Sequence, residues 1–587
     1  DPRGRVRPHR LRTPSATALE IIAAGDPSPP DHVDFALAYL LDDIYETHYD
    51  TVYANTLCPR NIAEALAGPD ADRWLRALAR EVQQHEKNCT FGPPIAAKDL
   101  PPGRKAIPVD VVLKIKRDGT FKVRCIIKGF HMIQGLDFNE TFAPVPCMSV
   151  LRLFLALATH FDWEIKQGDV STAFLAADMD SDVTVALPNW FRADATGAET
   201  GYTLRKLIKA VPGIPQGPRL WHKKSHGVYT AADLSQCKSE PCLYFCTKRM
   251  LFLIVWVDDL FLFFPKQALP QATALWKHLQ ANLDLGDWQD IDDCLACTVH
   301  RDRPNRTLTL SQEPAARKLL LRLGMQDANP ADTPMVANSK LSKTQCPSAE
   351  QAAVMADEQR WYRSTVASFI YLVGWTRPDM AFAVSKLCKF MHNPGREHII
   401  ALKRLIRYLK ATADYGLKYD FSASNANKPG IYGYYDASHA DCPDTRKSTL
   451  AYLFLFSGCP ISWNTKLHTY ITTSTNHSEY CAAAKAAREA KLLEKVMLET
   501  GFGRYVKPID LFSDSKGAIA MAYNPVQRAA SKHVDLADHY AREQQERGTI
   551  TISYVSTRDM TADIFTKPLA RSDFTRHAAR LVHTVTL

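Results

Sequence analysis

Two adjacent carboxylates lie inside an otherwise apolar run, "LIVWVDDLFLFF", at residues 253 to 264. Burying even one charge without a partner costs several kcal/mol, so Asp258 and Asp259 need solvent or a counter-charge. A tight β-hairpin provides both, because its apolar flanks bury in a sheet while the acids protrude at the bend. Mg²⁺ bound through carboxylate oxygens would supply the counter-charge. A solvated turn is the ordinary explanation of an isolated Asp-Asp pair, and the apolar flanks argue against it.

A third carboxylate is expected on a neighbouring strand. Asp169 in "KQGDVSTAFL" is the candidate, because it ends a strand with alternating apolar residues. Three carboxylates can hold two divalent cations roughly 3.5–4 Å apart, which activate a 3′-hydroxyl and stabilise a leaving pyrophosphate. The sequence therefore predicts a metal site made by Asp169, Asp258 and Asp259.

A second set of acids lies in the C-terminal part of the chain. Asp436 ends a strand in "YGYYDAS", Glu479 begins a helix, Asp514 ends a strand, and Asp563 lies near a short helix. Four acids so placed can converge on one side of a sheet and hold two metals that activate water. Each also has an ordinary explanation, since Glu479 favours a helix N-terminus and Asp514 precedes a serine that can cap a helix.

Length and composition limit the class of protein. The 587 residues suggest roughly three or four domains, and 46% hydrophobic with 23% charged residues is a globular composition. The net charge of +9 fits either a solvated surface or a polyanionic partner. The 14 cysteines are scattered, with one C-x-x-C at Cys294 and Cys297, so free thiols in a reducing compartment are expected. No apolar run reaches about 18 residues, so no membrane span is predicted. The leading Asp suggests a fragment of a longer chain.

Local patterns predict the main elements. Helical spacing begins after Asn61, a plausible N-cap, and the stretch from 106 to 130 alternates around an Asp118-Gly119 turn typical of a hairpin. Residues 335–358 are polar and are interpreted as a connector. From about Gly430, three hairpin strands followed by alternating helices and strands predict a mixed sheet with helices.

Several motifs occur together in a fixed order: "ETFAPV", "QGDVSTAFL", "GIPQGPRLW", "WVDDL", "LSQ" and "TRPDMAFAV". This order resembles the copia-type reverse transcriptases of long-terminal-repeat retrotransposons, from about Pro59 onward. The later motifs "TRKST", "SEY", "KHVD" and "ADIFTKPL" resemble the ribonuclease H of the same family.

The resemblance implies an α+β, multidomain fold: a right-hand polymerase with fingers, palm and thumb, then a connection and a ribonuclease H-like α/β domain. The implied division is residues 1–57 as a tail or linker, 58–275 as fingers and palm, 276–335 as palm end and thumb, 336–425 as the connection, and 426–587 as the ribonuclease H-like domain.

The resemblance also implies roles for single residues. Asp169 and the Asp258-Asp259 pair match the palm carboxylates, and Phe174 matches the aromatic gate that leaves no room for a 2′-hydroxyl. Gln216 matches a Pro-Gln-Gly element that lies against nucleotide and template, although Pro and Gly alone explain a bend. Trp256 stands where the family usually has Tyr, so altered efficiency is expected.

In the basic hairpin, Lys116, Lys122 and Arg124 match the fingers and are candidates to clamp the incoming triphosphate, since they neutralise phosphate charge. Exposed Lys and Arg are also typical of an ordinary edge strand. His533 in "SKHVD" is either a surface histidine or an aid to proton transfer or product release.

The leading hypothesis is a reverse transcriptase with ribonuclease H activity, using two Mg²⁺ ions per site or Mn²⁺ in their place. The implied partners are an RNA template, a DNA primer, the RNA–DNA hybrid, deoxynucleoside triphosphates, and the integrase and capsid proteins of the same element, with no membrane. The implied location is a cytoplasmic virus-like particle or the nucleus. Contacts to the duplex should go mostly to phosphate and sugar.

Two alternatives remain. A catalytically impaired, domesticated or decayed nucleic-acid-binding remnant would show lost carboxylates, whereas all seven are present. An RNA-dependent RNA polymerase shares the palm carboxylates, but Phe174 and the ribonuclease H-like part argue against it.

Overall fold

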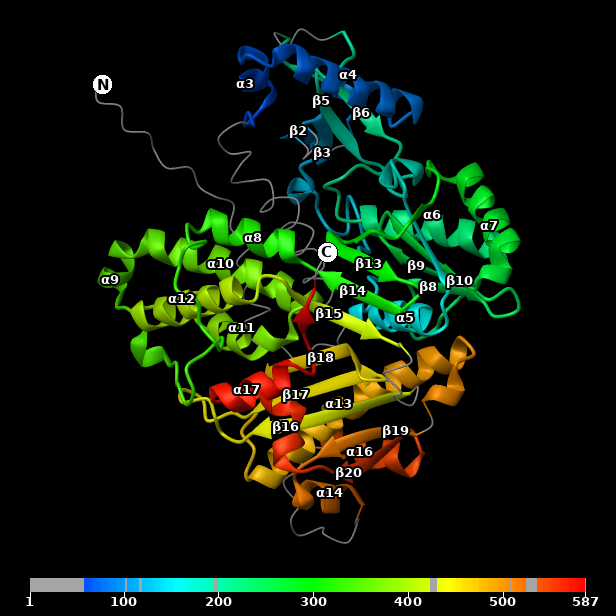
Figure 1. Ribbon diagram of the computed structural model, residues 1–587. Helices are drawn as coiled ribbons and strands as arrows, with labels where there is room; N and C mark the ends of the chain where they lie inside the picture. The colour runs from blue at the N-terminus through cyan, green and yellow to red at the C-terminus, as the bar shows by residue number, and fades with distance from the viewer. Residues whose placement is uncertain are drawn as a thin grey trace. The chain divides into compact units, whose positions relative to one another are not determined.

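The computed structural model forms two compact units, one within residues 58–292 and one comprising most of residues 293–585. Both units mix helices with sheets (Figure 1). The predicted tail, residues 1–57, lies outside the described residues, and no described helix is long and apolar enough to cross a membrane. The described residues are 58–100, 103–115, 119–194, 199–422, 430–506, 508–523 and 536–585.

The first sheet of the first unit contains the predicted hairpin, and we call it the hairpin sheet. Strand β2 pairs antiparallel with β3, with Ile115 opposite Phe121. Gly119 in the turn has a φ of +78°, which glycine adopts without steric cost. Helix α4 covers this sheet and brings the ring of Trp74 to 4.6 Å from that of Phe121. The strand order is β1-β6-β5-β2-β3, with β1 (Phe91–Pro94), β6 (Tyr202–Leu207), β5 (Thr184–Pro188), β2 (Ile107–Ile115) and β3 (Phe121–Ile127).

The helical pattern after Asn61 forms two helices, α3 (Ile62–Ala67) and α4 (Ala71–Lys87). Asn61 is the predicted N-cap, and its side chain accepts a hydrogen bond from the backbone N–H of Glu64 at 2.9 Å. The break falls at Gly68-Pro69, because proline disfavours a helical conformation at the residue before it.

The second sheet of the first unit, the carboxylate sheet, contains the opening run. Helix α5 packs against one face, where Phe154 lies 5.5 Å from Phe252 and 5.7 Å from Phe263. Helices α6 and α7 pack against the other face, so the strands are apolar on both sides rather than alternating. The strand order is β11-β4-β10-β9-β8-β7, with β11 (Gln289–Asp290), β4 (Glu164–Asp169), β10 (Asp259–Phe264), β9 (Leu251–Trp256), β8 (Leu243–Cys246), β7 (Ser235–Gln236), α5 (Met148–His160), α6 (Gly217–Ala231) and α7 (Leu269–Asn282).

The second unit begins with a sheet assembled from distant parts of the chain. Strand β14 pairs with β15, and β15 pairs with the C-terminal β21. Five helices follow β14 before the chain reaches β15. The strand order is β12-β13-β14-β15-β21, with β12 (Asp293–Cys294), β13 (Cys297–Asp302), β14 (Thr307–Ser311), β15 (Tyr415–Asp420), β21 (His583–Thr584), α8 (Glu313–Arg322), α9 (Ala349–Val354), α10 (Ala356–Trp375), α11 (Ala381–Cys388) and α12 (Arg396–Ala411).

This arrangement corrects the predicted domain boundaries. Helix α7 runs across the boundary placed after residue 275, and the compact units divide after Asp292. The segments 276–335 and 336–425 share one sheet through β14 and β15, and so does the end of the predicted ribonuclease H-like domain through β21. Long-range strand pairing of this kind leaves no signal in local sequence patterns.

The predicted polar connector at 335–358 was partly wrong, because α9 and the start of α10 lie within it. Ser348 and Gln351 form a capping box at the start of α9. The capping box is the signal that the sequence offered for this helix.

The motif "TRPDM" has a structural role. Arg377 binds Asp379 through two hydrogen bonds of 3.0 and 2.8 Å, and both side chains are buried. Tyr408 donates a further hydrogen bond of 2.7 Å to the same carboxylate. The paired geometry compensates for the cost of burying two charges.

The last sheet, the C-terminal sheet, has the predicted mixed character. Strands β17 and β18 pair antiparallel, whereas β16, β19 and β20 run parallel to one another. Its order is β18-β17-β16-β19-β20, with β18 (Cys459–Leu467), β17 (Thr449–Phe456), β16 (Ile431–Ser438), β19 (Ile509–Ser513), β20 (Ile550–Tyr554), α13 (Thr475–Glu499), α14 (Lys516–Tyr523), α16 (Tyr540–Glu546) and α17 (Arg571–Ala578).

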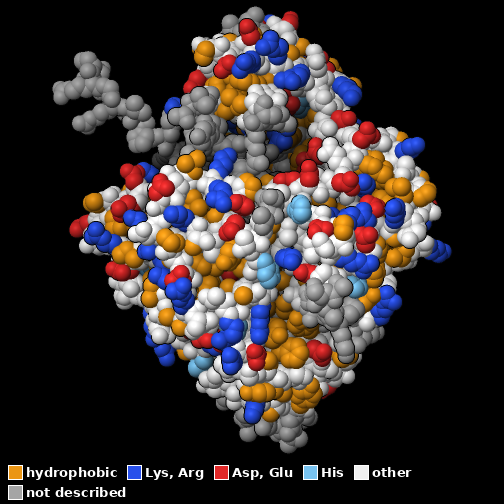
Figure 2. Space-filling view, in the orientation of Figure 1, with side chains coloured by type: hydrophobic (Ala, Val, Ile, Leu, Met, Phe, Trp, Pro, Cys, Tyr) orange, Lys and Arg blue, Asp and Glu red, His pale blue; other side chains and the backbone are white. Residues whose placement is uncertain are grey.

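The surface charge is mixed. On the face drawn in Figure 2, the described Lys and Arg side chains are interspersed with Asp and Glu. The net charge of +9 is therefore not gathered into one basic patch over the described part of this face.

Candidate active sites

The first carboxylate site lies where two neighbouring strands of the carboxylate sheet end. In the antiparallel pairing of β10 with β4, Asp259 lies opposite Asp169. Asp259 also lies opposite Trp256 in the β9–β10 hairpin, so Val257 and Asp258 form a two-residue turn. The backbone N–H of Val170 donates to the Asp258 carbonyl at 3.0 Å. The structure thus brings the three predicted acids to one end of one sheet.

Solvent reaches these acids. Asp169 is exposed, and Asp258 and Asp259 are partly exposed, whereas residues 251–255 of β9 and 260–264 of β10 are buried. The arrangement matches the predicted apolar hairpin with a protruding acidic tip, and it avoids the cost of burying charge.

The turn itself has an unusual backbone. Val257 has a φ of +54°, a conformation that is costly for a β-branched residue. Trp221 of α6 donates its indole N–H to the Val257 carbonyl at 2.6 Å and is almost fully buried. The sequence analysis did not assign this residue, although it ends the quoted motif "GIPQGPRLW". Trp221 fastens the acidic turn to α6.

Phe174 and Gln216 lie close to the same helix. Phe174, in the 3-10 turn η3 (Phe174–Ala176), is partly buried between the cores of the hairpin sheet and the carboxylate sheet. Its ring lies against Gly217 at the start of α6, since a Cβ placed there would be 3.4 Å from it.

The prediction that the Gln216 side chain contacts substrate does not fit the structure. Gln216 is completely buried, and its amide donates to the Asp137 carbonyl and to Ser181 Oγ, both at 3.3 Å. The side chain thus bonds to the segments that carry Asp137 and Ser181, a role that the sequence analysis did not assign.

Of the three basic residues predicted to clamp the triphosphate, Lys122 and Arg124 are among the described residues. Lys122 and Arg124 alternate with buried residues along β3 and are both partly exposed on one side of it. Lys122 lies opposite Lys114. Lys116 and His533 lie outside the described residues. Trp256 ends β9 beside the acidic turn and is partly buried.

The second carboxylate site brings together residues from two strands of the C-terminal sheet and from helix α13. Carboxylate oxygens of Asp436, Glu479 and Asp514 lie within 4.8 Å of one another. Asp436 belongs to β16 and Asp514 directly follows β19, and these strands are parallel neighbours, so their C-terminal ends meet at one edge. Glu479 reaches them from the start of α13.

Asp563, on the 3-10 turn η10 (Thr561–Phe565), joins this group through a lysine. The Lys567 ammonium lies 2.8 Å from an oxygen of Asp563 and 3.4 Å from an oxygen of Asp436. Thr566 donates a hydrogen bond to Asp436. Both residues stand in the quoted motif "ADIFTKPL", and the sequence analysis assigned only its aspartate.

The electrostatics of this site favour a bound cation. Glu479 is 4% exposed, and burial followed by repulsion from Asp436 raises its pKa to about 10. Burial and Asp436 likewise raise the pKa of Asp563 to about 7, against the opposing effect of Lys567. One oxygen of Asp436 and one of Glu479 are buried with no hydrogen-bond partner among the described residues. Crowded carboxylates with unpaired oxygens fit a hard divalent cation such as Mg²⁺.

The C-x-x-C pair has an ordinary role. Cys294 and Cys297 face each other across a two-residue turn between β12 and β13, and both side chains are buried in the core.

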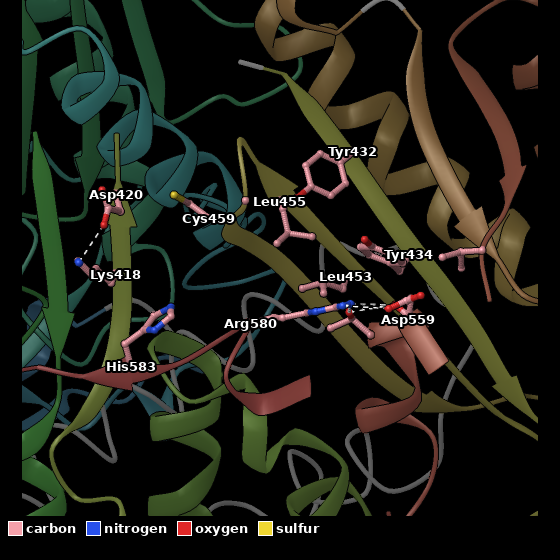
Figure 3. A pocket seen from close by; sticks show the side chains of 13 residues that line it. Lys418, Asp420, Tyr432, Tyr434, Leu453, Leu455, Cys459, Asp559, Arg580 and His583 are labelled. Carbon is pink, nitrogen blue, oxygen red and sulfur yellow. Dashed lines mark hydrogen bonds and ion pairs between the residues drawn. The ribbon is translucent and has the colours of Figure 1, made fainter. Parts of the chain in front are cut away.

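The second unit also contains a cavity of about 580 Å³ beside the C-terminal sheet (Figure 3). Tyr432 and Tyr434 line it from β16. Lys418 pairs with Asp420 at 2.9 Å, and Arg580 pairs with Asp559 at 3.2 Å, so its charged side chains are already paired with one another. Among the described residues, its lining contains none of the four carboxylates.

Comparison with known proteins identifies the family. Residues 96–337 match the family model "Reverse transcriptase (RNA-dependent DNA polymerase)". The retrovirus-related Pol polyprotein from transposon TNT 1-94 of Nicotiana tabacum is 33% identical over 525 residues, covering 88% of this chain and 38% of the relative. The Pol polyprotein from transposon RE1 of Arabidopsis thaliana is 30% identical over 530 residues, covering 89% and 34%.

A solved foamy viral protease–reverse transcriptase in complex with ds DNA covers 94% of this chain and 84% of its own, with 13% identity and a TM-score of 0.46. The chain spans little more than a third of the length of the two transposon polyproteins. Identity of at least 30% extends over most of this chain, well beyond the residues of the family model. The chain therefore belongs to the copia-type retrotransposon Pol family, and residues 96–337 are its reverse transcriptase region.

Proposed function

We propose that this chain copies RNA into DNA and DNA into DNA, and that it degrades the RNA strand of the resulting hybrid. The observation that carries the proposal is the strand register that sets Asp169 opposite Asp259, with Asp258 in the adjoining turn. The proposed ligands are an RNA template, a DNA primer, their hybrid and deoxynucleoside triphosphates. Integrase and capsid proteins of the same element are proposed partners within a cytoplasmic virus-like particle or in the nucleus.

In the first carboxylate site, Asp169, Asp258 and Asp259 would hold two Mg²⁺ ions, for which Mn²⁺ can substitute. When bound, such ions activate a primer hydroxyl and stabilise a leaving pyrophosphate. The rigid hairpin flanks keep the acids in place, because β9 and β10 are buried on both faces. Phe174 would exclude a 2′-hydroxyl by its bulk, and Lys122 and Arg124 would bind the triphosphate.

In the second carboxylate site, Asp436, Glu479, Asp514 and Asp563 would hold the ions for cleavage of RNA. The raised pKa values of Glu479 and Asp563 reflect the repulsion that a divalent cation would relieve. Lys567, paired with Asp563 and Asp436, would orient these two carboxylates.

The test is extension of an oligo(dT) primer on poly(rA) with dTTP and Mg²⁺, with RNA cleavage followed on the same hybrid. Asp258→Asn should abolish extension, by at least about 10³-fold, because it removes a metal-binding charge while keeping the shape of the side chain. RNA cleavage should persist in this variant.

Asp194→Asn is the matched control, because Asp194 is a largely exposed acid of the same unit that pairs with Arg192 at the surface. It should extend the primer like the wild type. A wild-type chain that binds the hybrid but neither extends nor cleaves it would instead identify a nucleic-acid-binding remnant.

A further inference from the structure

A second cluster of metal-ligating side chains lies in the C-terminal part of the second unit. Ligand atoms of His468, Cys481 and Asp538 lie within 4.8 Å of one another. His468 directly follows β18, Cys481 lies on α13, and Asp538 belongs to the 3-10 turn η8 (Leu536–His539). A strand end, a helix and a 3-10 turn thus place an imidazole, a thiol and a carboxylate around one point.

The cluster is separate from the second carboxylate site. Cys481 follows Glu479 by two positions on α13, and successive helical residues are rotated by about 100°, so these two side chains leave the helix on nearly opposite sides. In the described part of the chain, the three cluster residues form a group of ligand atoms separate from that of Asp436, Glu479 and Asp514.

Two members of this cluster are buried, and one of its polar atoms lacks a hydrogen-bond partner within the described ranges, which is unusual for a chance grouping of side chains. Cys481 is 2% exposed and Asp538 is 5% exposed. Among the described residues, no Lys or Arg forms an ion pair with Asp538, although a buried carboxylate normally needs one. The Nε2 atom of His468 is buried and has no hydrogen-bond partner in the described part of the chain.

A fourth polar group, the Tyr470 hydroxyl, lies beside the three ligand atoms. The Tyr470 hydroxyl donates to Asp538 and lies 3.5 Å from the sulfur of Cys481. Tetrahedral zinc sites have metal–ligand bonds of about 2.0–2.3 Å, so their ligand atoms lie about 3.6 Å apart. A contraction of about 1 Å would bring the three ligands to that spacing.

We propose that His468, Cys481 and Asp538 bind one Zn²⁺ ion, with the Tyr470 hydroxyl or a water molecule as the fourth ligand. The ligand chemistry selects a borderline-soft cation, because thiolate and imidazole bind Zn²⁺ well and Mg²⁺ poorly. Binding transfers the Cys481 thiol proton to solvent and forms a sulfur–zinc bond, with no redox change. The ion fastens η8 and the end of β18 to the start of α13, which carries Glu479. This proposal stands independently of the proposed catalytic activities.

The test uses the purified full chain and Co²⁺ as a probe, because Co²⁺ bound to a thiolate gives a near-ultraviolet charge-transfer band that carboxylate-bound cobalt lacks. We expect one equivalent of Zn²⁺ in the isolated protein and a thiolate–cobalt band after exchange. Cys481→Ser should abolish the band, and His468→Gln and Asp538→Asn should weaken Co²⁺ binding at least 10-fold. Asp538→Asn keeps an oxygen for Tyr470 to bond, so it separates loss of a ligand from loss of a hydrogen bond.

Cys459→Ser is the matched control, because Cys459 is a buried free thiol of the same sheet outside the cluster. It should keep the band. Added Zn²⁺ should raise the melting temperature of the wild type and of Cys459→Ser but not of Cys481→Ser. Absence of a thiolate band in the folded wild type, or a band that survives Cys481→Ser, would overturn the proposal whether or not the chain extends primers or cleaves RNA.

Discussion

Repulsion between neighbouring carboxylates is reduced in opposite ways at the two carboxylate sites. The acids of the first site lie at a hairpin tip and at the end of the neighbouring strand, where solvent reaches them, and strand pairing sets their positions. In the second site, Asp436, Glu479 and Asp563 are buried and come from segments far apart in the sequence, and Lys567 pairs with Asp436 and Asp563. Under the proposed function, the first site would need metal only for chemistry, whereas the second would also need positive charge to offset the repulsion between its buried acids.

The largest expected effect separates the two sites by function. Glu479→Gln should lower RNA cleavage by at least about 10³-fold, because the amide cannot supply the negative charge that Glu479 contributes to the metal site. DNA synthesis should stay within about 2-fold of wild type, because the first site lies in the other compact unit. Cleavage and extension are measured on one labelled hybrid.

Glu543→Gln on α16 is the control, because Glu543 forms an exposed ion pair with Arg547, and exposed pairs contribute little to stability. It should leave both activities unchanged. If Glu479→Gln loses synthesis as well, the two sites are coupled through folding and the contrast between them fails.

The next effect tests sugar selection at the first site. Phe174→Val should raise incorporation of ribonucleotides relative to deoxynucleotides about 10- to 100-fold, because the smaller side chain leaves room for a 2′-hydroxyl. The ratio of the two incorporation efficiencies is the measurement, since a general loss of stability affects both alike.

Phe91→Val is the control variant, because it removes the same volume from a side chain that is also partly buried against the core of the hairpin sheet. It should leave the sugar ratio unchanged. An unchanged ratio in Phe174→Val would leave Phe174 with only its packing role between the two cores.

A smaller effect tests how the hairpin tip is held. Trp221→Phe removes the indole donor to the Val257 carbonyl while keeping an aromatic ring in the core. Loss of one hydrogen bond to a strained turn should lower extension about 10-fold, and RNA cleavage should not change. Single-turnover extension separates this loss from weaker primer binding.

Trp463→Phe is the counterpart in the second unit, because it removes the 3.0 Å hydrogen bond from Trp463 to the Val373 carbonyl. It should leave extension intact. Equal losses in the two variants would show that removing any buried indole donor disturbs the chain, and Trp221 would have no special link to the acidic turn.

The contrast also explains what the sequence could reveal. The hairpin tip was predictable, because an apolar run interrupted by two acids can bury its flanks and keep the acids in solvent only if it bends at the acids. The four later acids were also individually identified, since each ends a strand or lies by a helix. Lys567 and Trp221 were missed because their roles depend on contacts with Asp436 and Val257, far away in the sequence.

Two errors have a similar origin. Gln216 was assigned to substrate from its motif, but its burial depends on Asp137 and Ser181, which no local pattern connects to it. The boundary placed after residue 275 falls inside α7, and the boundaries after residues 335 and 425 divide a sheet in which β14, β15 and β21 join three separated segments. Local periodicity predicts elements, whereas their partners across the sequence depend on tertiary packing.

The smallest effect follows from the buried charge of the second site. Because the pKa of Glu479 is raised from 4.5 to about 10 in the folded state, the unfolded chain releases this proton first as pH rises. Between about pH 4.5 and 10 the folded state binds more protons, so the free energy of unfolding of metal-free protein should fall with pH. Glu479→Gln removes this loss and should raise the melting temperature by about 2 °C or more at pH 8–9, with no difference below pH 4.5.

Mg²⁺ should narrow this gap in melting temperature, because a bound cation stabilises the charged form of Glu479 in the wild type. Asp258→Asn at the solvent-exposed hairpin tip should shift the metal-free melting temperature by no more than about 1 °C over the same range. If the two variants show the same pH dependence in calorimetry, burial does not distinguish the sites. If only Glu479→Gln differs from the wild type in melting temperature, and Mg²⁺ narrows that difference, the second site uses metal binding for folding as well as for cleavage. The first site, at the hairpin tip, would not need metal for folding.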